Sequence, residues 1–324
     1  MTSGLRRLSI WATSGPAWPL ATFLAIGMLL RIPAIWLADG HEFVDQSFQY
    51  IDPAWHLATG LAWHPTWEWE AGMRSWTYPG LLAGILRGLM FLGIEEPFRL
   101  MRAVRAVHAA ISLLPLWLFW LAIVRWRPIA SPRLPLLLFA GSGFLVTTGV
   151  QPSGPAFGAT LAIAAVLAFH GPRWFPALAG LLLGLAFCGR VQEALFGPAL
   201  AMVGIWQRRP AAVVWLIAGC VPGLLLLGFV DYFTLGGFFS SPWAYFEANI
   251  LQGAASKFGQ RPWWFYLAAG VVPVAVLVPP WLRIAANRLA IGARLLPGAA
   301  AAAALHLLVH SCIARKALRF EYAS

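Results

Sequence analysis

Residues 211–230 read AAVVWLIAGCVPGLLLLGFV, twenty positions without a charged side chain. A helix needs an apolar run of about this length to cross the hydrocarbon core of a bilayer. The run is continuous and lacks the alternation of polar and apolar residues that a barrel strand would show. The stretch therefore predicts a membrane-spanning helix.

The rest of the chain has the same character. Hydrophobic residues make up 60% of the sequence and charged residues 11%, whereas a soluble domain carries about 25% charged residues. We interpret residues 1–324 as a single all-α, multi-span integral membrane domain. The first apolar run follows Arg6 and Arg7 but extends past the length of a signal peptide, which favours a retained helix. We predict helices at 19–38, 106–124, 135–150, 156–170, 174–188, 194–206, 211–230, 265–282 and 297–311.

Segment 81–105 has a mixed pattern. Arg87 interrupts it, and Arg99, Arg102 and Arg105 recur with a spacing of three residues. This spacing places the three arginines on one helical face. The segment predicts an amphipathic helix that lies at the membrane interface or opens the second span.

The loop charges indicate an orientation. Loops 125–134, 171–173, 207–210 and 283–294 are short and contain arginine but no acidic residue, as cytoplasmic loops often do. Loops 39–80, 151–155, 189–193, 231–264 and the C-terminal tail then face the other side, where nearly all acidic residues fall. The net charge of +11 is spread over short loops, which favours contact with anionic lipid headgroups and argues against nucleic acid.

The large first non-cytoplasmic loop, 39–80, concentrates polar chemistry. It reads DGHEFVDQSFQYIDPAWHLATGLAWHPTWEWEAGMRSWTYPG and contains five tryptophans. A solvated loop with an interfacial aromatic belt is the simple alternative. Carboxylates, amides, an imidazole and a guanidinium directly after a span instead favour a binding or catalytic site.

Several motifs in this loop stand in a fixed order. They are Asp45, Phe48-Gln49-Tyr50, Asp52-Pro53-Ala54, Thr66-Trp67-Glu68-Trp69 and Arg74-Ser75-Trp76-Thr77-Tyr78-Pro79. The loop resembles that of glycosyltransferase family 22, whose eukaryotic members are lumenal mannosyltransferases of GPI-anchor and N-glycan assembly. The family's His-Pro-Asp-Glu is Phe43-Val44-Asp45-Gln46 here, so its second acidic residue is a glutamine.

Later segments extend the resemblance along almost the whole chain. The family's short Arg-x-Gln loop resembles Gly189-Arg190-Val191-Gln192, and its large late loop resembles Asp231-Tyr232, residues 241–249 and residues 258–266. Its His-Lys-Glu-x-Arg-Phe resembles Arg315-Lys316-Ala317-Leu318-Arg319-Phe320. Family members continue through further helices, so we expect that this chain is a C-terminally truncated member.

The resemblance implies a GT-C fold, a polyprenyl- or dolichyl-phosphate sugar as donor, and inverting transfer to a hydroxyl of a glycan or glycolipid. It implies no cofactor and no obligatory metal. Transfer to an alcohol needs a base that takes the hydroxyl proton. Asp45 matches the family's first-loop aspartate and is the catalytic candidate, with a plain helix-end carboxylate as the alternative.

The leaving phosphate gains charge as its bond to the sugar breaks, and fixed cations stabilise that charge. The candidates are Arg74, Arg190, Arg315, Lys316 and Arg319. Arg190 directly follows an apolar span, where a charge needs a partner, although an arginine that snorkels to the interface is equally compatible.

Sugar or acceptor contacts are assigned to polar and aromatic residues of the two large loops. These are Gln49, Tyr50, Asp52, His56, Trp67, Glu68, Trp69, Asp231 and Asn249. Asp52 and His56 would share a face if that stretch is helical, and the indoles beside Glu68 would stack on sugar rings. A zinc site needs three protein ligands plus an open position; His41, His56 and His64 would meet only by accident of the fold, so no metal is predicted.

Other functions remain open. Gln46, Arg315 and Ala317 favour a non-catalytic subunit of a glycan-assembly complex. A lipid or sugar transporter would carry ionisable residues inside broken spans, whereas these spans are nearly free of charge. The Ala, Gly, Arg and Trp content favours a bacterial inner membrane protein with a periplasmic site; a eukaryotic source would place the site in the lumen of the endoplasmic reticulum.

Overall fold

The computed structural model describes residues 16–38, 45–126, 128–129 and 131–253, together with the single residues 262, 264 and 305. Every element in these ranges is helical. The predicted helices at 265–282 and 297–311 lie outside them. Three helical stretches are long and apolar enough to cross a membrane: Leu20–Leu37, Pro97–Trp126 and Pro210–Leu235. The chain is therefore an all-α membrane protein, as the sequence predicts.

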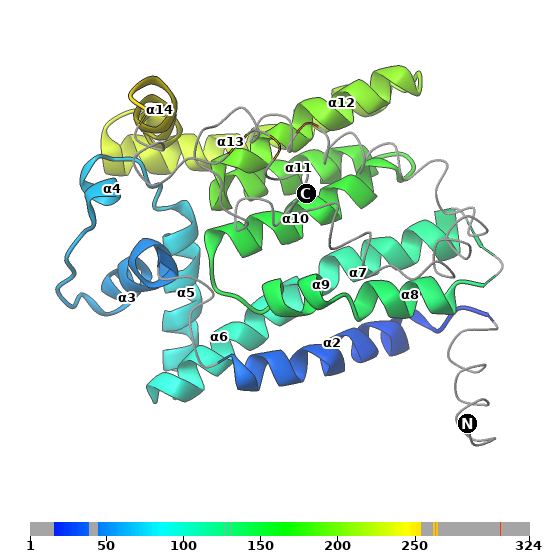
Figure 1. The fold of residues 1–324 in the computed structure, drawn as a ribbon, viewed down its shortest axis with the longest axis horizontal. Helices are drawn as coiled ribbons and strands as arrows, with labels where there is room; N and C mark the ends of the chain where they lie inside the picture. The colour runs from blue at the N-terminus through cyan, green and yellow to red at the C-terminus, as the bar shows by residue number, and fades with distance from the viewer. Residues whose placement is uncertain are drawn as a thin grey trace.

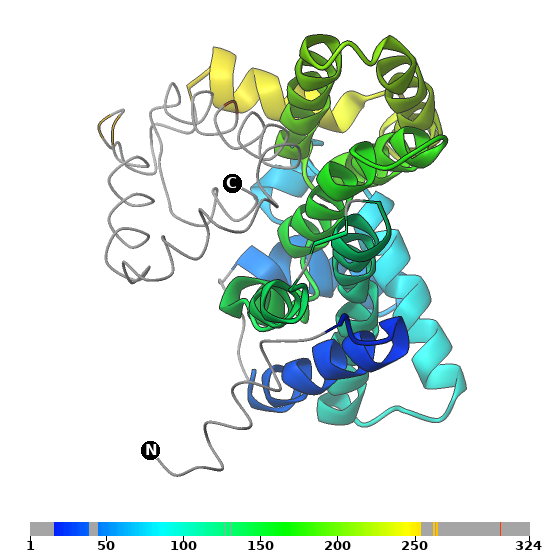
Figure 2. The same cartoon turned by 90° about the vertical axis from the view of Figure 1, so that its right-hand side faces the viewer.

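Most of the helices lie side by side in one bundle (Figure 1). They are α2 (Leu20–Leu37), α6 (Pro97–Ile111), α7 (Leu113–Trp120) with the π-helical turn Leu121–Trp126, α8 (Arg133–Ala140), α9 (Gly143–Thr148), α10 (Gly154–Phe169), α11 (Phe175–Gly189), α12 (Phe196–Trp206) and α13 (Pro210–Leu235). Viewed from the side, α10 to α13 form the upper part of the bundle and α2 with α6 to α9 the lower part (Figure 2).

Helix α10 forms the centre of the core. Nearly all of its residues are buried, and α7, α11 and α12 pack against it. Glycines allow α11 and α13 to approach closely, because a Cβ added at Gly223 would lie 2.7 Å from the Cα of Gly184. Contact between small residues is the usual way in which helices associate inside a membrane.

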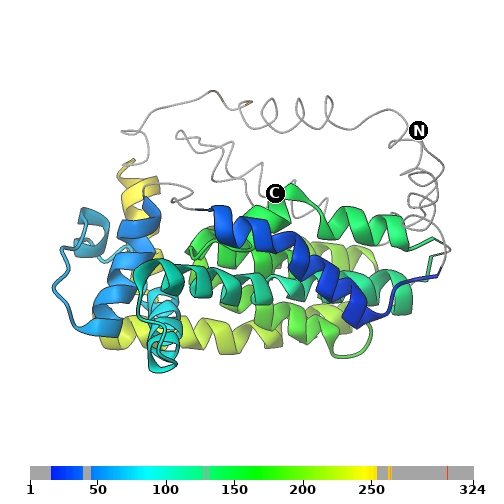
Figure 3. The same cartoon turned by 90° about the horizontal axis from the view of Figure 1, so that it is seen from below.

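The remaining helices gather at one end of the bundle (Figures 1 and 3). These are α3 (Asp52–Thr59), α4 (Trp67–Glu70), α5 (Thr77–Phe91) and α14 (Ser240–Phe246), with the π-helical turns η1 (Ser47–Ile51) and η4 (Glu247–Leu251). The described part of the first loop is thus largely helical, and so is the start of the predicted loop 231–264, because α13 continues to Leu235.

Segment 81–105 forms two helices rather than one. Helix α5 ends at Phe91, the chain turns at Gly93 with a φ of 81°, and α6 begins at Pro97. Glu96 caps α6 by accepting bonds from the amides of Phe98 and Arg99. The bond from Arg99, followed by that from Phe98, lowers the pKa of the Glu96 carboxyl. Helix α6 continues into α7, so this segment opens the second span.

Two other predictions need correction. The helix predicted at 135–150 is two helices, α8 and α9, which separate at Gly141 and Ser142. Glycine and serine pairs are a common site of helix breaks. The spans are also less free of charge than predicted, because Arg31 lies in the middle of α2 and is fully buried.

Candidate functional site

A polar cleft lies where η1, α5 and α14 meet α11 and α13. It encloses about 50 Å³. Its walls come from four segments that are far apart in sequence: Gln49 and Tyr50 from η1, residues 73–79, residues 187–192, and Leu227, Ser241 and Tyr245 near the late loop.

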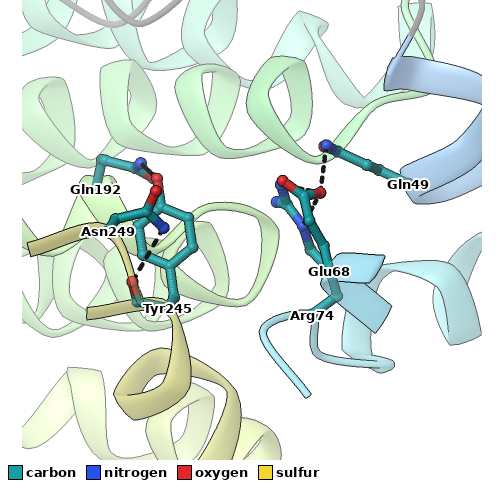
Figure 4. A network of polar contacts seen from close by, with 6 residues as sticks. All are labelled: Gln49, Glu68, Arg74, Gln192, Tyr245 and Asn249. Carbon is teal, nitrogen blue, oxygen red and sulfur yellow. Dashed lines mark hydrogen bonds and ion pairs between the residues drawn. The ribbon is translucent and has the colours of Figure 1, made fainter. Parts of the chain in front are cut away.

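The first wall is a chain of hydrogen bonds from the first loop. The Oε2 atom of Glu68 accepts a bond from Gln49 Nε2 at 2.7 Å. It also accepts bonds from Arg74 Nε at 3.1 Å and Arg74 Nη2 at 2.8 Å. The side chains of Arg74 and Glu68 are 21% and 19% exposed, so the ion pair is largely shielded from solvent. The three residues are drawn on the right of Figure 4.

The electrostatics of this wall stabilise a permanent positive charge. Burial acts to lower the pKa of Arg74, but Tyr50, Glu68 and Tyr245 together outweigh burial and raise it. Burial likewise raises the pKa of the Tyr50 hydroxyl, although Arg74 and Arg190 oppose the shift. Tyr50 therefore remains a neutral hydroxyl beside a charged guanidinium.

The second wall comes from the late loop and the loop after α11. Gln192 Nε2 donates to the hydroxyl of Tyr245 at 2.6 Å, and Asn249 Nδ2 donates to the main-chain oxygen of Tyr245 at 3.0 Å. These residues face the first wall across the cleft (Figure 4). The Arg74 guanidinium lies 6.0 Å from the centre of the Tyr245 ring, within range of a cation–π contact.

Asp231 holds the two walls together from behind. It is fully buried; its Oδ1 accepts a bond from Ser75 Oγ at 2.7 Å. Its Oδ2 accepts bonds from the amide and hydroxyl of Ser241 at 2.9 and 2.7 Å. Asp231 does not line the cleft. This position fits a role in ordering the loops and does not fit direct contact with a sugar.

Asp45 lies in the helical turn that leads into η1 and is half-buried. It does not line the cleft itself, but it precedes Gln49 by four residues in one helical stretch, so both side chains project from a similar side. Gln46 points elsewhere: it is buried, and its Nε2 donates to Gln151 Oε1 at 3.3 Å and to the main-chain oxygen of Pro152 at 3.5 Å.

Asp52 and His56 share one face of α3, as predicted, but neither lines the cleft. His56 Nδ1 lies 2.7 Å from the main-chain oxygen of Leu61, and its ring lies 5.9 Å from that of Trp63. His56 thus orders the chain after α3. The part of the chain that the structure describes contains no cluster of three His, Cys, Asp or Glu side chains that could hold a metal.

The two tryptophans beside Glu68 differ in exposure. Trp69 is buried against Trp63 and Trp76, with ring centres 5.4 and 4.5 Å away. Its faces are therefore covered, and the expectation that it stacks on a sugar needs correction. Trp67 is 48% exposed and keeps an accessible ring.

Arg190 lines the cleft and is only 8% exposed, so it does not snorkel to the interface. Its Nη1 lies 3.9 Å from Oε1 of Glu193, which is fully buried. Of the five predicted phosphate-binding cations, Arg74 and Arg190 meet in this cleft. Arg315, Lys316 and Arg319 lie outside the described residues.

Sequence reasoning missed five polar residues of the site: Ser75, Tyr78, Gln192, Ser241 and Tyr245. All five line the cleft, and the hydroxyl of Tyr78 lies 2.9 Å from Nε2 of the buried His108. They belong to the motifs that carry the family resemblance, and membership of those motifs was the one sign in the sequence that they form part of the site. Glu193 was also missed, and the sequence offers no indication of its burial.

Comparisons with known proteins identify the family of the chain. The model of the Alg9-like mannosyltransferase family matches residues 18–323. GPI mannosyltransferase 3 of Drosophila melanogaster is 25% identical over 78% of this chain and 44% of its own length. The protein of the same name from Trypanosoma brucei brucei is 24% identical over 74% of this chain and 50% of its own length.

Mannosyltransferase APTG1 of Arabidopsis thaliana is 21% identical over 73% of this chain and 45% of its own length. The chain thus spans about half the length of the curated relatives it matches. No solved structure matches it. Because the family model covers nearly the whole sequence, the chain belongs to the Alg9-like mannosyltransferase family.

Proposed function

We propose that this chain transfers a mannose, or a related hexose, from a polyprenyl-phosphate donor to a hydroxyl of a glycan or glycolipid. The observation that carries the proposal is one polar cleft that joins Arg190 to the Gln49–Glu68–Arg74 chain. Guanidinium groups suit a phosphate, and amides and carboxylates suit sugar hydroxyls. Relatives named GPI mannosyltransferase 3 support the choice of sugar.

The proposed transfer is a single displacement. The acceptor oxygen forms a bond to the anomeric carbon, the bond from that carbon to the phosphate oxygen breaks, and the phosphate leaves with the electron pair. Asp45 takes the hydroxyl proton, and Arg190 and Arg74 stabilise the charge that grows on the leaving phosphate. Attack opposite the leaving group inverts the anomeric carbon. No cofactor enters this scheme.

The cleft is too small for a sugar as it stands. It encloses about 50 Å³, whereas ligand pockets are typically about 300 Å³ or more. Donor binding therefore requires the two walls to separate, which would shift Arg74 from the ring of Tyr245. Trp67, which is 48% exposed, is the proposed indole contact of the sugar or acceptor.

The working face follows from the loop charges. The end of the bundle that holds the cleft carries the first and late loops, which face away from the cytoplasm by the distribution of arginine. In a bacterial host this face is periplasmic; in a eukaryotic host it is the lumen of the endoplasmic reticulum.

The test is sugar transfer by the purified chain in detergent. Donors are polyprenyl-phosphate mannose and related phosphodiesters, and host lipid extract supplies the acceptor. We expect Asp45→Asn to lower the rate about 10²- to 10⁴-fold, the usual effect of losing a general base. The matched control is Glu70→Gln, an exposed carboxylate of the same loop, which should keep the wild-type rate.

A second candidate function is that of a non-catalytic subunit. Gln46 favours it, because this residue replaces the family's second acidic residue and is tied to Gln151 rather than turned to the cleft. Absence of transfer by the wild-type chain, in an assay where a full-length relative is active, would support this role and overturn the enzymatic proposal.

A further inference from the structure

Glu193 is the least expected charged residue of the molecule. Its side chain is 0% exposed, and neither carboxylate oxygen has a hydrogen-bond partner among the described residues. Buried polar atoms are nearly always hydrogen-bonded, and a buried carboxylate without such bonds is costly. A residue kept in this state therefore calls for a specific explanation.

Arg190 is the nearest charge. Its Nη1 lies 3.9 Å from Glu193 Oε1, beyond hydrogen-bond distance. The other cleft cation is held differently, because Arg74 makes two hydrogen bonds to Glu68. The ion pair of Arg190 and Glu193 is thus longer and more deeply buried than that of Arg74 and Glu68. Burial strengthens the attraction between the two charges, but the Glu193 carboxylate lacks hydrogen-bond donors among the described residues.

The fold makes room for this carboxylate. Glu193 lies in the 3₁₀ turn η3 (Val191–Leu195), against the start of α10. A Cβ added at Gly158 would lie 3.1 Å from Glu193 Cγ and 3.5 Å from Arg190 Cβ. A glycine on α10 therefore leaves the space in which the two side chains lie beside each other.

Few other charges act on Glu193. Helices α10, α11 and α12 pack against η3. Helices α10 and α12 contain no titratable residue, and α11 contains Cys188. The protonation of Glu193 is then set by its burial, by Arg190, and by any anion that binds next to Arg190.

We propose that Glu193 positions Arg190 at the cleft and takes up one proton when a phosphate group binds there. The inference rests on the proposed function and names a regulation of the same site. The phosphate and the Glu193 carboxylate would then both lie beside Arg190, and a second anion close by favours the neutral form of a buried carboxyl. A phosphodiester remains ionised at any physiological pH, so the buried carboxyl without hydrogen bonds is the group that becomes neutral.

The consequence is an affinity that depends on pH. Where Glu193 is ionised in the free protein and protonated in the complex, the affinity for donor falls about tenfold for each unit rise in pH. Below this window Glu193 is already protonated, and the affinity is constant. A glutamine at this position imitates the protonated carboxyl and should bind with the same high affinity at every pH.

The experiment measures binding of polyprenyl-phosphate mannose to the purified full chain in detergent by tryptophan fluorescence, between about pH 5.5 and 8.5. This donor is a phosphodiester and does not titrate in that range. We expect wild type to lose affinity about tenfold per pH unit over part of the range, and Glu193→Gln to be independent of pH. The control Glu247→Gln, at an exposed carboxylate, should follow wild type.

The proposal would be overturned if the affinity of Glu193→Gln fell with pH as steeply as that of wild type. Binding by wild type that does not depend on pH would also overturn it. Calorimetry of wild type in two buffers of different ionisation enthalpy counts the protons taken up on binding and needs no variant. Binding without proton uptake would also overturn the proposal. Binding with the expected pH dependence but without transfer would refute the enzymatic function alone. Absence of binding at every pH would refute both.

Discussion

At the scale of single residues, buried charges inside this bundle serve different purposes. Arg31 is fully buried in α2, and its guanidinium donates to neutral oxygens: Ser112 Oγ at 2.6 Å, the main-chain oxygen of Gly27 at 2.8 Å and that of Leu145 at 3.3 Å. These bonds tie α2 to the junction of α6 and α7 and to α9. A charged residue in a span usually suggests a functional site, but here its contacts are structural.

Asp231 gives a prediction at this scale. Asp231→Ala removes the acceptor of three hydrogen bonds and leaves the buried hydroxyl of Ser241 unsatisfied. We expect a loss of about 3 kcal/mol or more in the free energy of unfolding, since bonds to a charged group are worth about 1.5–3 kcal/mol each. Thermal unfolding in detergent measures the change.

The matched control is Thr234→Ala on the same helix, where an exposed hydroxyl bonds its own helix at Val230. The free energy of unfolding of this variant should lie within about 0.5 kcal/mol of the wild-type value. Equal loss in the two variants would mean that Asp231 does not hold the walls of the cleft together.

At the scale of helices, close contact between α11 and α13 places the cleft. Cys188 and Arg190 reach the cleft from the end of α11, and Leu227 from α13. A Cβ at Gly184 would lie 3.1 Å from the Cα of Gly223, and one at Gly219 would lie 2.8 Å from the main-chain carbon of Ala177. The obstacles are backbone atoms, which cannot move aside as a flexible side chain can.

Gly223→Ala tests this contact. The added methyl group would lie 2.7 Å from Gly184 Cα, so the helices must separate, at a cost of about 1–3 kcal/mol. Gly88→Ala on α5 is the control, because no atom lies within 4 Å of its added Cβ, and alanine favours a helix over glycine. Thermal unfolding should therefore show opposite signs for the two variants; similar shifts would contradict close packing of α11 and α13.

Helix boundaries were predictable where the hydrophobic pattern and the chain breaks coincide. The helix predicted at 156–170 is α10 (Gly154–Phe169), and that at 174–188 is α11 (Phe175–Gly189). The break at Gly141 was missed because the prediction followed the apolar runs on both sides and passed over Gly141-Ser142-Gly143 between them. Apolar character decides whether a segment enters the membrane, and it does not decide where the helical hydrogen bonds are interrupted.

At the scale of the whole molecule, residues distant in sequence form one cleft at one end of the bundle. Tyr245 lies beside Arg74, and Asp231 bonds both Ser75 and Ser241. The first loop and the late loop must therefore lie on the same side of the membrane. This follows from the structure independently of the loop charges.

Labelling with a membrane-impermeant thiol reagent tests the topology. The three native cysteines are first changed to serine. A single cysteine then replaces Glu70 or Glu247 near the cleft, or Arg173 or Arg208 in the arginine-rich loops. All four positions are exposed. We expect labelling of the first pair in intact cells and of the second pair only in inverted vesicles. Labelling of Glu70 and Glu247 positions from opposite sides would contradict the shared cleft.

The sequence by itself determined the class of the molecule and the segments that carry its chemistry. Hydrophobicity and charge are local properties, so apolar runs predicted the spans, and ordered motifs singled out residues 45–79, 189–192 and the late loop. The partners within the cleft were decided by tertiary structure: the bond of Glu68 to both Gln49 and Arg74, the turn of Gln46 toward Gln151, and the burial of Glu193 beside Arg190. These contacts depend on how closely glycine-containing helices approach, and that distance is set by the packing of the whole bundle rather than by any one segment.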